Sequence, residues 1–282
     1  MARKIRVGFQ GERGAFSEKA AVKLAGAAID LAPQKTFLDM FRALLGKRID
    51  YAIVPIENTL AGSVIENYDL LLKYHFPILA ETSIRIVHNL IVNKSVTLRG
   101  VKKVYSHPVA LRQCLKFLDK HRNWEVVTYY DTAGSVKMIA EEKLTDSAAI
   151  ASEISASIYD AKILKRDIGD DKENYTRFFL LGRKGPLGKD MARLPKKAVK
   201  TSIAFVTRNQ PGALARCLSI FAMRDISLTK IESRPIKGRP FEYRFYVDFL
   251  GAQSEPAARS ALKQLAENTE SVRVFGSYPS IG

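Results

Sequence analysis

Short apolar runs alternate with segments of helical periodicity through the first 180 residues. The runs that predict strands are IRVGFQG, YAIVPIEN, ILAETSIRIV, VKKVYSHP, EVVTYYD, SAAIAS and TRFFLLG. Between them, apolar residues recur at helical spacing over 17–24, 37–44, 64–72, 108–118, 135–142 and 153–159. This alternation predicts an α/β architecture with a largely parallel sheet. Its two clusters indicate two lobes, with a ligand site in the cleft between them.

The pattern changes after residue 200. The runs TSIAFVTR, ISLTKIES, FEYRFYVDFL and SVRVFGSYP predict strands, and GALARCLSIFAM and PAARSALKQLAEN predict helices. Their order, βαββαβ, is that of a ferredoxin-like domain. Residues 183–200 hold seven basic residues, one acid, two glycines and two prolines, which is typical of a linker. We therefore predict a first domain over 1–182, a basic linker over 183–200 and a second domain over 201–282.

Charge points to an anionic ligand. The chain has 45 basic and 29 acidic residues, a net charge of +16. Basic residues are spread along the chain without the interleaved aromatic residues that single-strand nucleic-acid binders use, so we expect a small anion and no nucleic acid. No apolar run is long enough to span a membrane, and none follows the basic start as in a signal peptide. Cys114 and Cys217 form no disulfide framework, which favours a cytoplasmic protein.

Several familiar motifs are missing. The spacing of Gly8, Gly11 and Gly14 does not fit a dinucleotide-binding loop, and no phosphate-binding loop occurs. The four histidines are scattered, without HExxH or paired Cys/His spacing, and there is no GxSxG turn. We therefore expect no cofactor, no metal and no serine nucleophile of the hydrolase type.

Four loops follow predicted strands and open predicted helices: GERGAFSEKA, ENTLAGSV, SHPVALRQC and DTAGSVK. Each supplies Ser, Thr or Asn near a helix start, which alone is ordinary helix capping. Helix starts also present free N–H groups and the positive end of the dipole to anions. We expect at least two of these loops to face one ligand.

Thr176 and Arg177 interrupt an otherwise apolar run, ENYTRFFLL. Alternation along a strand sends neighbouring side chains to opposite faces. Either one of the two points into the cleft while the other supports it from behind, or a local twist aims both at the ligand. The strand alone favours a simpler interpretation, in which an edge hydroxyl caps a neighbour and the guanidinium is solvated.

Taken together, these motifs resemble the prephenate dehydratases of phenylalanine biosynthesis. GFQGERGAFSEKAA, YAIVPIENTLAGSV, SHPVALRQC, DTAGS, AAIAS and NYTRFFLLG stand in the order and spacing of that family. NQPGALARCL and KIESRP resemble the two effector motifs of its ACT regulatory domain. Two positions depart from the family pattern: Val109 stands where glutamine is usual, and Thr59 where serine is frequent.

The resemblance implies a two-lobed fold like that of periplasmic binding proteins, with a cofactor-free site that converts prephenate to phenylpyruvate, carbon dioxide and water. Thr176 would stabilise the departing hydroxide as a preorganised donor, Arg177 would hold a substrate carboxylate, and Glu57 or water would deliver the proton. The residues that carry over as lining of the substrate site are Asn58, Thr59, Ser106, Gln113, Thr132 and Phe178.

The resemblance also implies that L-phenylalanine binds where the ACT domains of two subunits meet and inhibits the enzyme, in a homodimer or homotetramer. The effector residues that carry over are Asn209, Gly212, Ala213, Leu214, Glu232, Ser233 and Arg234. Two alternatives remain. Arogenate dehydratases use the same scaffold on the transaminated substrate, and a non-catalytic sensor of amino acids or other small anions could share the architecture.

Overall fold

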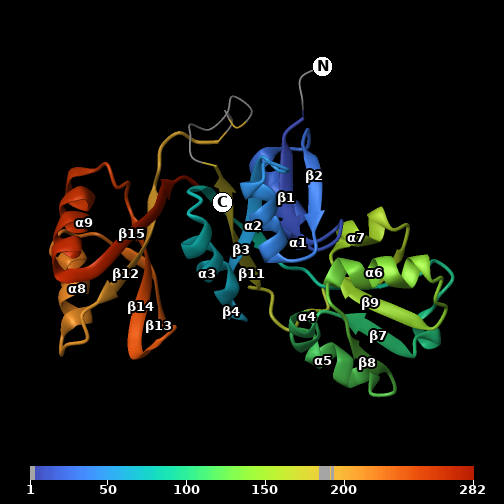
Figure 1. Ribbon diagram of the computed structural model, residues 1–282. Helices are drawn as coiled ribbons and strands as arrows, with labels where there is room; N and C mark the ends of the chain where they lie inside the picture. Colours follow the sequence, from blue (N-terminus) through green and yellow to red (C-terminus); the bar gives the residue numbers. More distant parts are fainter. Residues whose placement is uncertain (1–3, 184–190, 192–193) are drawn as a thin grey trace. The chain divides into compact units, whose positions relative to one another are not determined.

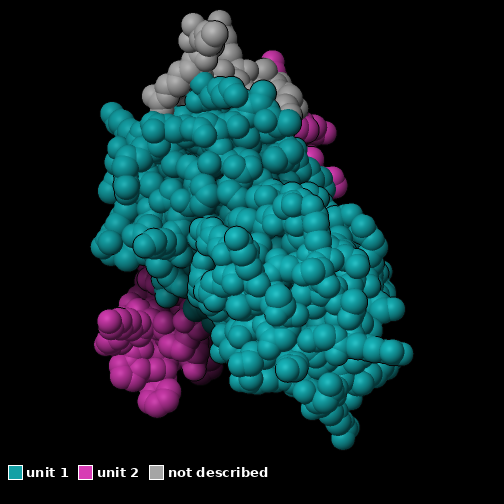
Figure 2. Space-filling view, turned by 90° about the vertical axis from the view of Figure 1, so that its right-hand side faces the viewer, with its two compact units in different colours: residues 1–74, 82–180 teal, residues 75–81, 181–282 magenta. Residues whose placement is uncertain are grey.

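The computed structural model describes residues 4–183, 191 and 194–282, and the chain divides into two compact units (Figure 2). The first comprises Met1–Tyr74 and Thr82–Leu180, and the second comprises His75–Glu81 and Leu181–Gly282. The division at Leu180 falls two residues before the predicted domain boundary, and the segment 75–81 was not expected in the second unit. Most of the predicted linker, residues 184–190 and 192–193, lies outside the described residues.

The first lobe of the first unit is built on a sheet that contains the strand order β5-β11-β3-β1-β2, of which Figure 1 labels β11, β3, β1 and β2. Its strands are β1 (Arg6–Gln10), β2 (Asp30–Gln34), β3 (Tyr51–Asn58), β5 (Ile78–Arg85) and β11 (Tyr175–Gly182), and β4 (Gly62–Ser63) pairs with β3. Its helices are α1 (Phe16–Ala25), α2 (Phe37–Leu45) and α3 (Ile65–Tyr74). β1 runs parallel to both β2 and β3, and its Val7 and Phe9, which point to the same face of the sheet, are fully buried.

The second lobe has a mixed sheet in the order β10-β6-β9-β7-β8. Its strands are β6 (Asn89–Val92), β7 (Lys103–Ser106), β8 (Glu125–Thr128), β9 (Ser147–Ala151) and β10 (Lys162–Lys165). Its helices are α4 (Pro108–Arg112), α5 (Leu115–Leu118), α6 (Thr132–Glu141) and α7 (Glu153–Ile158), with 3-10 turns η1 (Leu98–Gly100) and η2 (Asp119–His121). β7 is parallel to β8 and β9, whereas β6 is antiparallel to β9 and β10, so this sheet is less parallel than predicted.

The chain crosses between the two lobes twice. The first crossing follows β5 at residues 86–88, and the second joins β10 to β11 over residues 166–174. The crossings are bonded to one another: the Ile86 N–H donates to the Asn174 carbonyl over 2.8 Å, and the Ile168 N–H donates to the His88 carbonyl over 2.9 Å. The predicted α/β fold with two lobes is confirmed.

The second unit contains a four-stranded antiparallel sheet in the order β13-β14-β12-β15. Its elements are β12 (Lys200–Thr207), α8 (Ala213–Ala222), β13 (Leu228–Ile236), β14 (Arg239–Leu250), α9 (Pro256–Asn268), β15 (Thr269–Tyr278) and β16 (Ser280–Ile281). Phe205, Phe221 and Phe249 are buried in one core formed by sheet and helices. The predicted βαββαβ order is confirmed. None of the helices in the described part of either unit is long and apolar enough to cross a membrane.

Candidate active site

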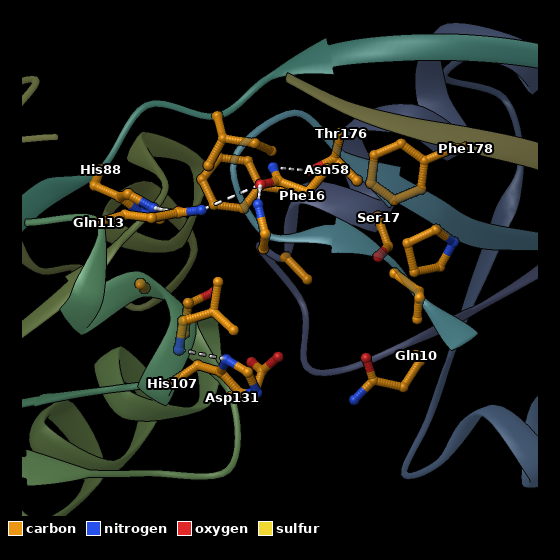
Figure 3. Close-up of a pocket in the computed structure, with 18 of the residues that line it drawn as sticks. Gln10, Phe16, Ser17, Asn58, His88, His107, Gln113, Asp131, Thr176 and Phe178 are labelled. Atoms are coloured by element: carbon orange, nitrogen blue, oxygen red, sulfur yellow. Dashed lines mark hydrogen bonds between the residues drawn. The ribbon is translucent and has the colours of Figure 1, made fainter. Parts of the chain in front are cut away.

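A cavity of about 420 Å³ opens in the first unit, and all four predicted loops contribute to its wall (Figure 3). Its volume is in the range typical of small-molecule sites. The residues that line it are Gln10, Ala15, Phe16, Ser17, Phe37, Pro55, Asn58, Ala61, Gly62, Ser63, Val64, Ile86, His88, His107, Val109, Ala110, Gln113, Tyr130, Asp131, Thr132, Thr176 and Phe178. They come from both lobes and from the first crossing, so the cavity lies where the lobes meet.

Strand alternation separates Thr176 from Arg177. Thr176 and Phe178 line the cavity, whereas Arg177 does not. The Arg177 guanidinium lies 4.8 Å from the centre of the Phe179 ring, and its Nη1 is 3.8 Å from Oε2 of Glu57. Glu57 is likewise outside the cavity wall. Of the two predicted arrangements, the structure has the one in which the hydroxyl faces the cavity and the cation supports the strand pair from behind. The substrate contacts expected of Arg177 and Glu57 stay predictions.

Three side-chain amides form a closed ring of hydrogen bonds, and two of them, Asn58 and Gln113, line the cavity (Figure 3). Gln113 Nε2 donates to Asn58 Oδ1 over 3.2 Å, Asn58 Nδ2 donates to Asn174 Oδ1 over 2.7 Å, and Asn174 Nδ2 donates to Gln113 Oε1 over 2.9 Å. Asn58 Nδ2 also donates to Thr176 Oγ1 over 2.9 Å. Because the Thr176 oxygen accepts this bond, its own hydrogen is left to donate into the cavity.

Gln113 reaches the ring because the predicted helix over 108–118 is broken. α4 ends at Arg112, Gln113 is its C-cap, and α5 begins only at Leu115. The Gln113 carbonyl accepts the Asp170 N–H over 2.8 Å, which ties the break to the second crossing. The break thus brings the Gln113 side chain to the crossings and within reach of Asn58 in the first lobe.

Two predicted lining residues serve the backbone instead. Ser106 is fully buried, and its hydroxyl donates to the Ile150 carbonyl over 2.6 Å, which joins β7 to β9. The Thr59 hydroxyl donates to the Glu173 carbonyl over 2.9 Å and accepts the Tyr175 N–H over 3.0 Å. Neither side chain lines the cavity, whereas the predicted Asn58, Gln113, Thr132 and Phe178 do. A hydroxyl that is committed to a strand-to-strand bond is not free to face a ligand.

The cavity wall carries no lysine or arginine among the described residues, so an anion must be met by other donors. α1 starts at Ala15 without a side-chain hydrogen bond to cap it, and the first residues of that helix line the cavity. Three other helix starts at the wall are capped: Thr36 Oγ1 accepts the Asp39 N–H at α2, His107 Nδ1 accepts the Val109 N–H at α4, and Asp131 Oδ1 accepts the Gly134 N–H at α6. The N–H groups and positive dipole end of α1 therefore offer an anion site in the wall.

The loop before α1 is held tightly by the second lobe. Gly14 has a φ of 89°, and a Cβ built there would lie 2.7 Å from Cα of Ser155 in α7. The Ser152 hydroxyl donates to the Gly14 carbonyl over 2.6 Å. The Tyr130 hydroxyl donates to Glu12 Oε1 over 3.1 Å, so this loop is also fastened to the residue before the α6 cap. Glycine is required at position 14 because a side chain would push the lobes apart.

Burial sets the protonation states around the cavity. It lowers the pKa of His88 and of His107, so both imidazoles are neutral at neutral pH and add no positive charge. Burial raises the pKa of Asp131, against the opposing effect of the N–H groups that its carboxylate accepts. In the described part of the chain, no group of three His, Cys, Asp or Glu side chains is placed to hold a metal ion.

The second unit has a smaller pocket of about 220 Å³ at the start of α8. Four predicted effector residues, Asn209, Gly212, Ala213 and Leu214, line it together with Phe241 and Tyr243. The other three predicted effector residues, Glu232, Ser233 and Arg234, lie on β13 and do not line it. The structure of a single chain therefore brings the first effector motif to a pocket and leaves the second motif apart from it.

Comparison with known proteins decides the family. A sequence model of prephenate dehydratase matches residues 7–186, and one of the ACT domain matches residues 201–267. The chain belongs to the prephenate dehydratase family. The predicted enzyme class, a hydro-lyase with a C-terminal ACT domain, is thereby confirmed over the non-catalytic sensor.

Relatives within the prephenate dehydratase family align along almost the whole chain. The arogenate dehydratase/prephenate dehydratase 2 of Arabidopsis thaliana is 43% identical, over an alignment that covers 98% of this chain and 73% of the length of the relative. A solved prephenate dehydratase from Arthrobacter aurescens, in complex with L-Phe, is 30% identical with a TM-score of 0.86 and covers 98% of this chain and 90% of its own. A structure described as a quorum-quenching acylase, GqqA, is 29% identical, with a TM-score of 0.86 and 98% of both chains covered.

Several cavity residues of this prephenate dehydratase family member were not predicted as site residues. His88 and His107 gave no signal beyond being isolated histidines, and Asp131 and Ser17 were noted only within loops. Asn174 does not line the cavity but belongs to the amide ring; it stands two positions before Thr176, just before β11 begins, and this spacing of two could have identified it.

Proposed function

We propose that the cavity of the first unit binds prephenate and converts it to phenylpyruvate, carbon dioxide and water. The observation that carries this proposal is the Thr176 hydroxyl, which faces the cavity with its oxygen already accepting from Asn58 Nδ2. A hydroxyl held in this way is a directed donor. The departing ring hydroxyl of prephenate is the group that needs such a donor.

The reaction breaks two bonds and forms a benzene ring. The bond between the ring and its carboxylate breaks, its electron pair enters the ring, and the carbon–oxygen bond to the hydroxyl breaks in turn. Thr176 donates a hydrogen bond to the leaving oxygen and stabilises the negative charge that develops there. One proton must be taken up to turn hydroxide into water. Because Glu57 does not line the cavity, we assign this proton to solvent water that reaches the leaving oxygen beside Thr176.

The two carboxylates of prephenate need different surroundings. The side-chain carboxylate is retained, and we place it at the uncapped start of α1, beside Phe16 and Ser17. The ring carboxylate leaves as neutral carbon dioxide. A cation beside it would stabilise the charged ground state and slow its departure. A cavity wall whose described residues include aromatic rings such as Phe178 and no lysine or arginine supports this division.

Arg177 serves the site from behind. Its guanidinium packs on Phe179 of β11, lies near Glu57 of β3, and does not line the cavity. Adjacent residues on those strands are Asn58 and Thr176. We therefore propose that Arg177 keeps the two strands in register and does not touch the substrate.

Arogenate is a second candidate substrate, and one observation favours it. The Asp131 carboxylate lines the cavity and could pair with the ammonium group that arogenate has in place of the keto oxygen of prephenate. The acylase named for one structural neighbour is not favoured. Among the described contacts, neither cavity histidine bonds to a hydroxyl that it could activate.

The purified protein should form phenylpyruvate when it is incubated with prephenate. In a parallel incubation with arogenate, phenylalanine would be the product. Asp131→Asn retains an oxygen to cap α6 and removes the charge, so it should lower turnover of arogenate more than turnover of prephenate. Formation of neither product would contradict the proposed function, and an equal effect of Asp131→Asn on both substrates would remove the role given to Asp131.

We further propose that L-phenylalanine binds at the α8 pocket of the second unit and inhibits. The start of α8 offers N–H groups to the carboxylate of the amino acid, and Phe241 and Tyr243 offer aromatic faces to its ring. Glu232, Ser233 and Arg234 would meet the effector from a second subunit, since they do not line the pocket within one chain. Association as a dimer or tetramer stays a prediction.

Gly212→Val should abolish inhibition by L-phenylalanine and preserve turnover in its absence. Gly212 has a φ of 73° at the start of α8, a conformation that valine strongly disfavours, so the pocket should be distorted. Gly238→Val is the matched control, because Gly238 also has a positive φ, 83°, and is not part of the pocket wall. The measurement is turnover as a function of L-phenylalanine concentration. Equal inhibition of the Gly212 variant and the parent would refute the proposal that L-phenylalanine binds at the α8 pocket.

A cytoplasmic location is proposed from the state of the cysteines. Cys114 and Cys217 are both buried free thiols, as is usual in a reducing compartment. Burial raises the pKa of Cys114 to about 12, so this thiol, next to Gln113, is unreactive at neutral pH and takes no part in the chemistry.

A further inference from the structure

The direction of the amide ring determines whether Thr176 can donate. A closed ring of three amides can run in either of two directions, because turning every amide around preserves all three bonds. In the direction described above, Asn58 presents its nitrogen to Thr176. In the reverse direction it would present its oxygen, and the Thr176 hydroxyl would donate to Asn58 instead of to a ligand. Something outside the ring must therefore fix its direction.

Backbone donors fix the ring on one side. The N–H groups of Leu60 and Ala61 donate to Asn58 Oδ1 over 3.1 and 2.8 Å. A backbone N–H can only donate, so the oxygen of Asn58 must face the turn after β3. These two bonds are in the exposed turn at residues 60–61. They fix the first amide of the ring from its solvent side.

His88 holds the ring on the opposite, buried side. Its Nε2 is 2.9 Å from Gln113 Oε1, which also accepts from Asn174. Because that oxygen can only accept, His88 must carry its proton on Nε2. Nδ1 is then a bare acceptor, and it is buried without a hydrogen-bond partner among the described residues. Phe16 packs edge-on against the imidazole, with ring centres 5.8 Å apart, and holds it in place.

We propose that His88 is a positioning residue for the dehydration: as the Nε2–H tautomer, it holds Gln113 in the direction that the backbone bonds to Asn58 set, and so keeps the amide ring closed and Asn58 in place against Thr176. This inference rests on the proposed function for its catalytic consequence and on the hydrogen-bond geometry for the tautomer. The lowered pKa of His88 is consistent with it, because a proton on Nδ1 would have no acceptor there.

The ring also connects donor orientation to the arrangement of the lobes. His88 belongs to the first crossing, Asn174 to the second, Asn58 to the first lobe and Gln113 to the second lobe. The ring closes only when the second lobe brings Gln113 Nε2 to within hydrogen-bond distance of Asn58. The complete ring, which holds Asn58 against Thr176, therefore exists only in a lobe arrangement like the one described.

Two substitutions at position 88 separate the effect of the Nε2–H donor from the effect of the shape of the imidazole ring. His88→Phe preserves an aromatic ring against Phe16 and cannot donate, so kcat for prephenate should fall roughly threefold to tenfold, the effect of one neutral hydrogen bond, with KM little changed. His88→Gln places an amide N–H near the position of Nε2 and should restore most of that loss. His121→Phe is the matched control, because His121 stacks on Trp124 outside the cavity and should leave both constants as in the parent.

A double-substitution cycle distinguishes positioning from general loosening of the fold. If His88 acts through Thr176, His88→Phe should have almost no further effect on kcat in a Thr176→Val background. A purely structural role would lower kcat by the same factor in both backgrounds. The same factor in both would overturn the proposal, as would a His88→Phe variant as fast as the parent.

The tautomer can be measured without any activity. Nitrogen-15 NMR of imidazole-labelled parent protein should show His88 neutral at neutral pH, with its proton on Nε2. A proton on Nδ1, or a protonated ring, would overturn the inference even if the enzyme were active and even if His88→Phe failed to fold. Conversely, the protein could have the Nε2–H tautomer and turn over neither prephenate nor arogenate. This result would refute the proposed function and still support the role of His88 in holding the amide ring.

Discussion

Thr176→Val is expected to lower kcat for prephenate by roughly 100- to 1,000-fold, the typical effect of removing one preorganised donor to a developing oxyanion. Valine has nearly the shape of threonine and removes only the hydroxyl. KM should change little, because the hydroxyl is proposed to bond mainly to the charge that appears in the transition state. Thr176→Ser retains an O–H at the same position and should recover most of the activity.

Steady-state kinetics of phenylpyruvate formation measure this effect, with Thr128→Val as the matched control. Thr128 ends β8, is exposed and lies outside the cavity wall, so its replacement should be silent. A Thr176→Val enzyme with near-normal turnover would show that the hydroxyl is not the donor. A large rise in KM at constant kcat would instead show that it serves ground-state binding.

Asn58→Asp is expected to lower kcat for prephenate by roughly 100-fold or more, an effect similar to that of Thr176→Val. The substitution is small, because it only exchanges one NH₂ group for one oxygen. The carboxylate still accepts the Leu60 and Ala61 N–H groups, so the turn after β3 should persist. It cannot donate to Thr176, so the Thr176 hydroxyl would turn to donate to position 58 and be lost to the leaving group. The new negative charge would also repel a dianionic substrate, so KM should rise.

Asn123→Asp is the control for charge alone, because Asn123 is exposed in the loop before β8. It should leave kcat and KM as in the parent. Thermal unfolding of both variants checks that the fold is intact. A folded Asn58→Asp enzyme with the kcat of the parent would contradict the view that Asn58 orients Thr176. It would show that turnover does not need a hydrogen-bond donor at position 58.

The alternation of apolar runs predicted most of the fold, and the exceptions have physical reasons. β2, Asp30–Gln34, was not predicted, because its apolar signal is short and contains Pro33. Proline is tolerated there since β2 ends the sheet order and has only β1 as a neighbour. The run ILAETSIRIV reads as one strand, yet β5 ends at Arg85 and the chain crosses to the other lobe. A crossing of three residues has no periodicity of its own to detect.

The site was predictable where strand alternation decided it and not where long-range contacts did. Period-2 alternation allowed for Thr176 and Arg177 on opposite faces, and the structure has that arrangement. The alternation could not predict which face of the strand lines the cavity, because that depends on where the second lobe lies. The bond from Asn58 to Thr176 joins residues 118 positions apart, and the bond from Gln113 to Asn58 joins residues 55 positions apart. No local pattern encodes such pairs.

Helix periodicity was misleading at one functional position. Apolar spacing over 108–118 predicts an uninterrupted helix, in which Gln113 would be an ordinary polar residue. The chain instead breaks between α4 and α5, where the Gln113 carbonyl bonds to Asp170 from the second crossing. A tertiary hydrogen bond thus overrides the local preference, and the break is what delivers Gln113 to the amide ring.

The central claim is that prephenate reacts in the cavity where Thr176, Asn58 and Gln113 meet. Its most direct test is a crystal structure of the slow Thr176→Val variant soaked with prephenate. We expect the side-chain carboxylate at the start of α1 and the ring hydroxyl within hydrogen-bond reach of the position that the Thr176 oxygen would occupy. Prephenate bound outside this cavity, or bound within it with its ring hydroxyl directed away from residue 176, would contradict the account.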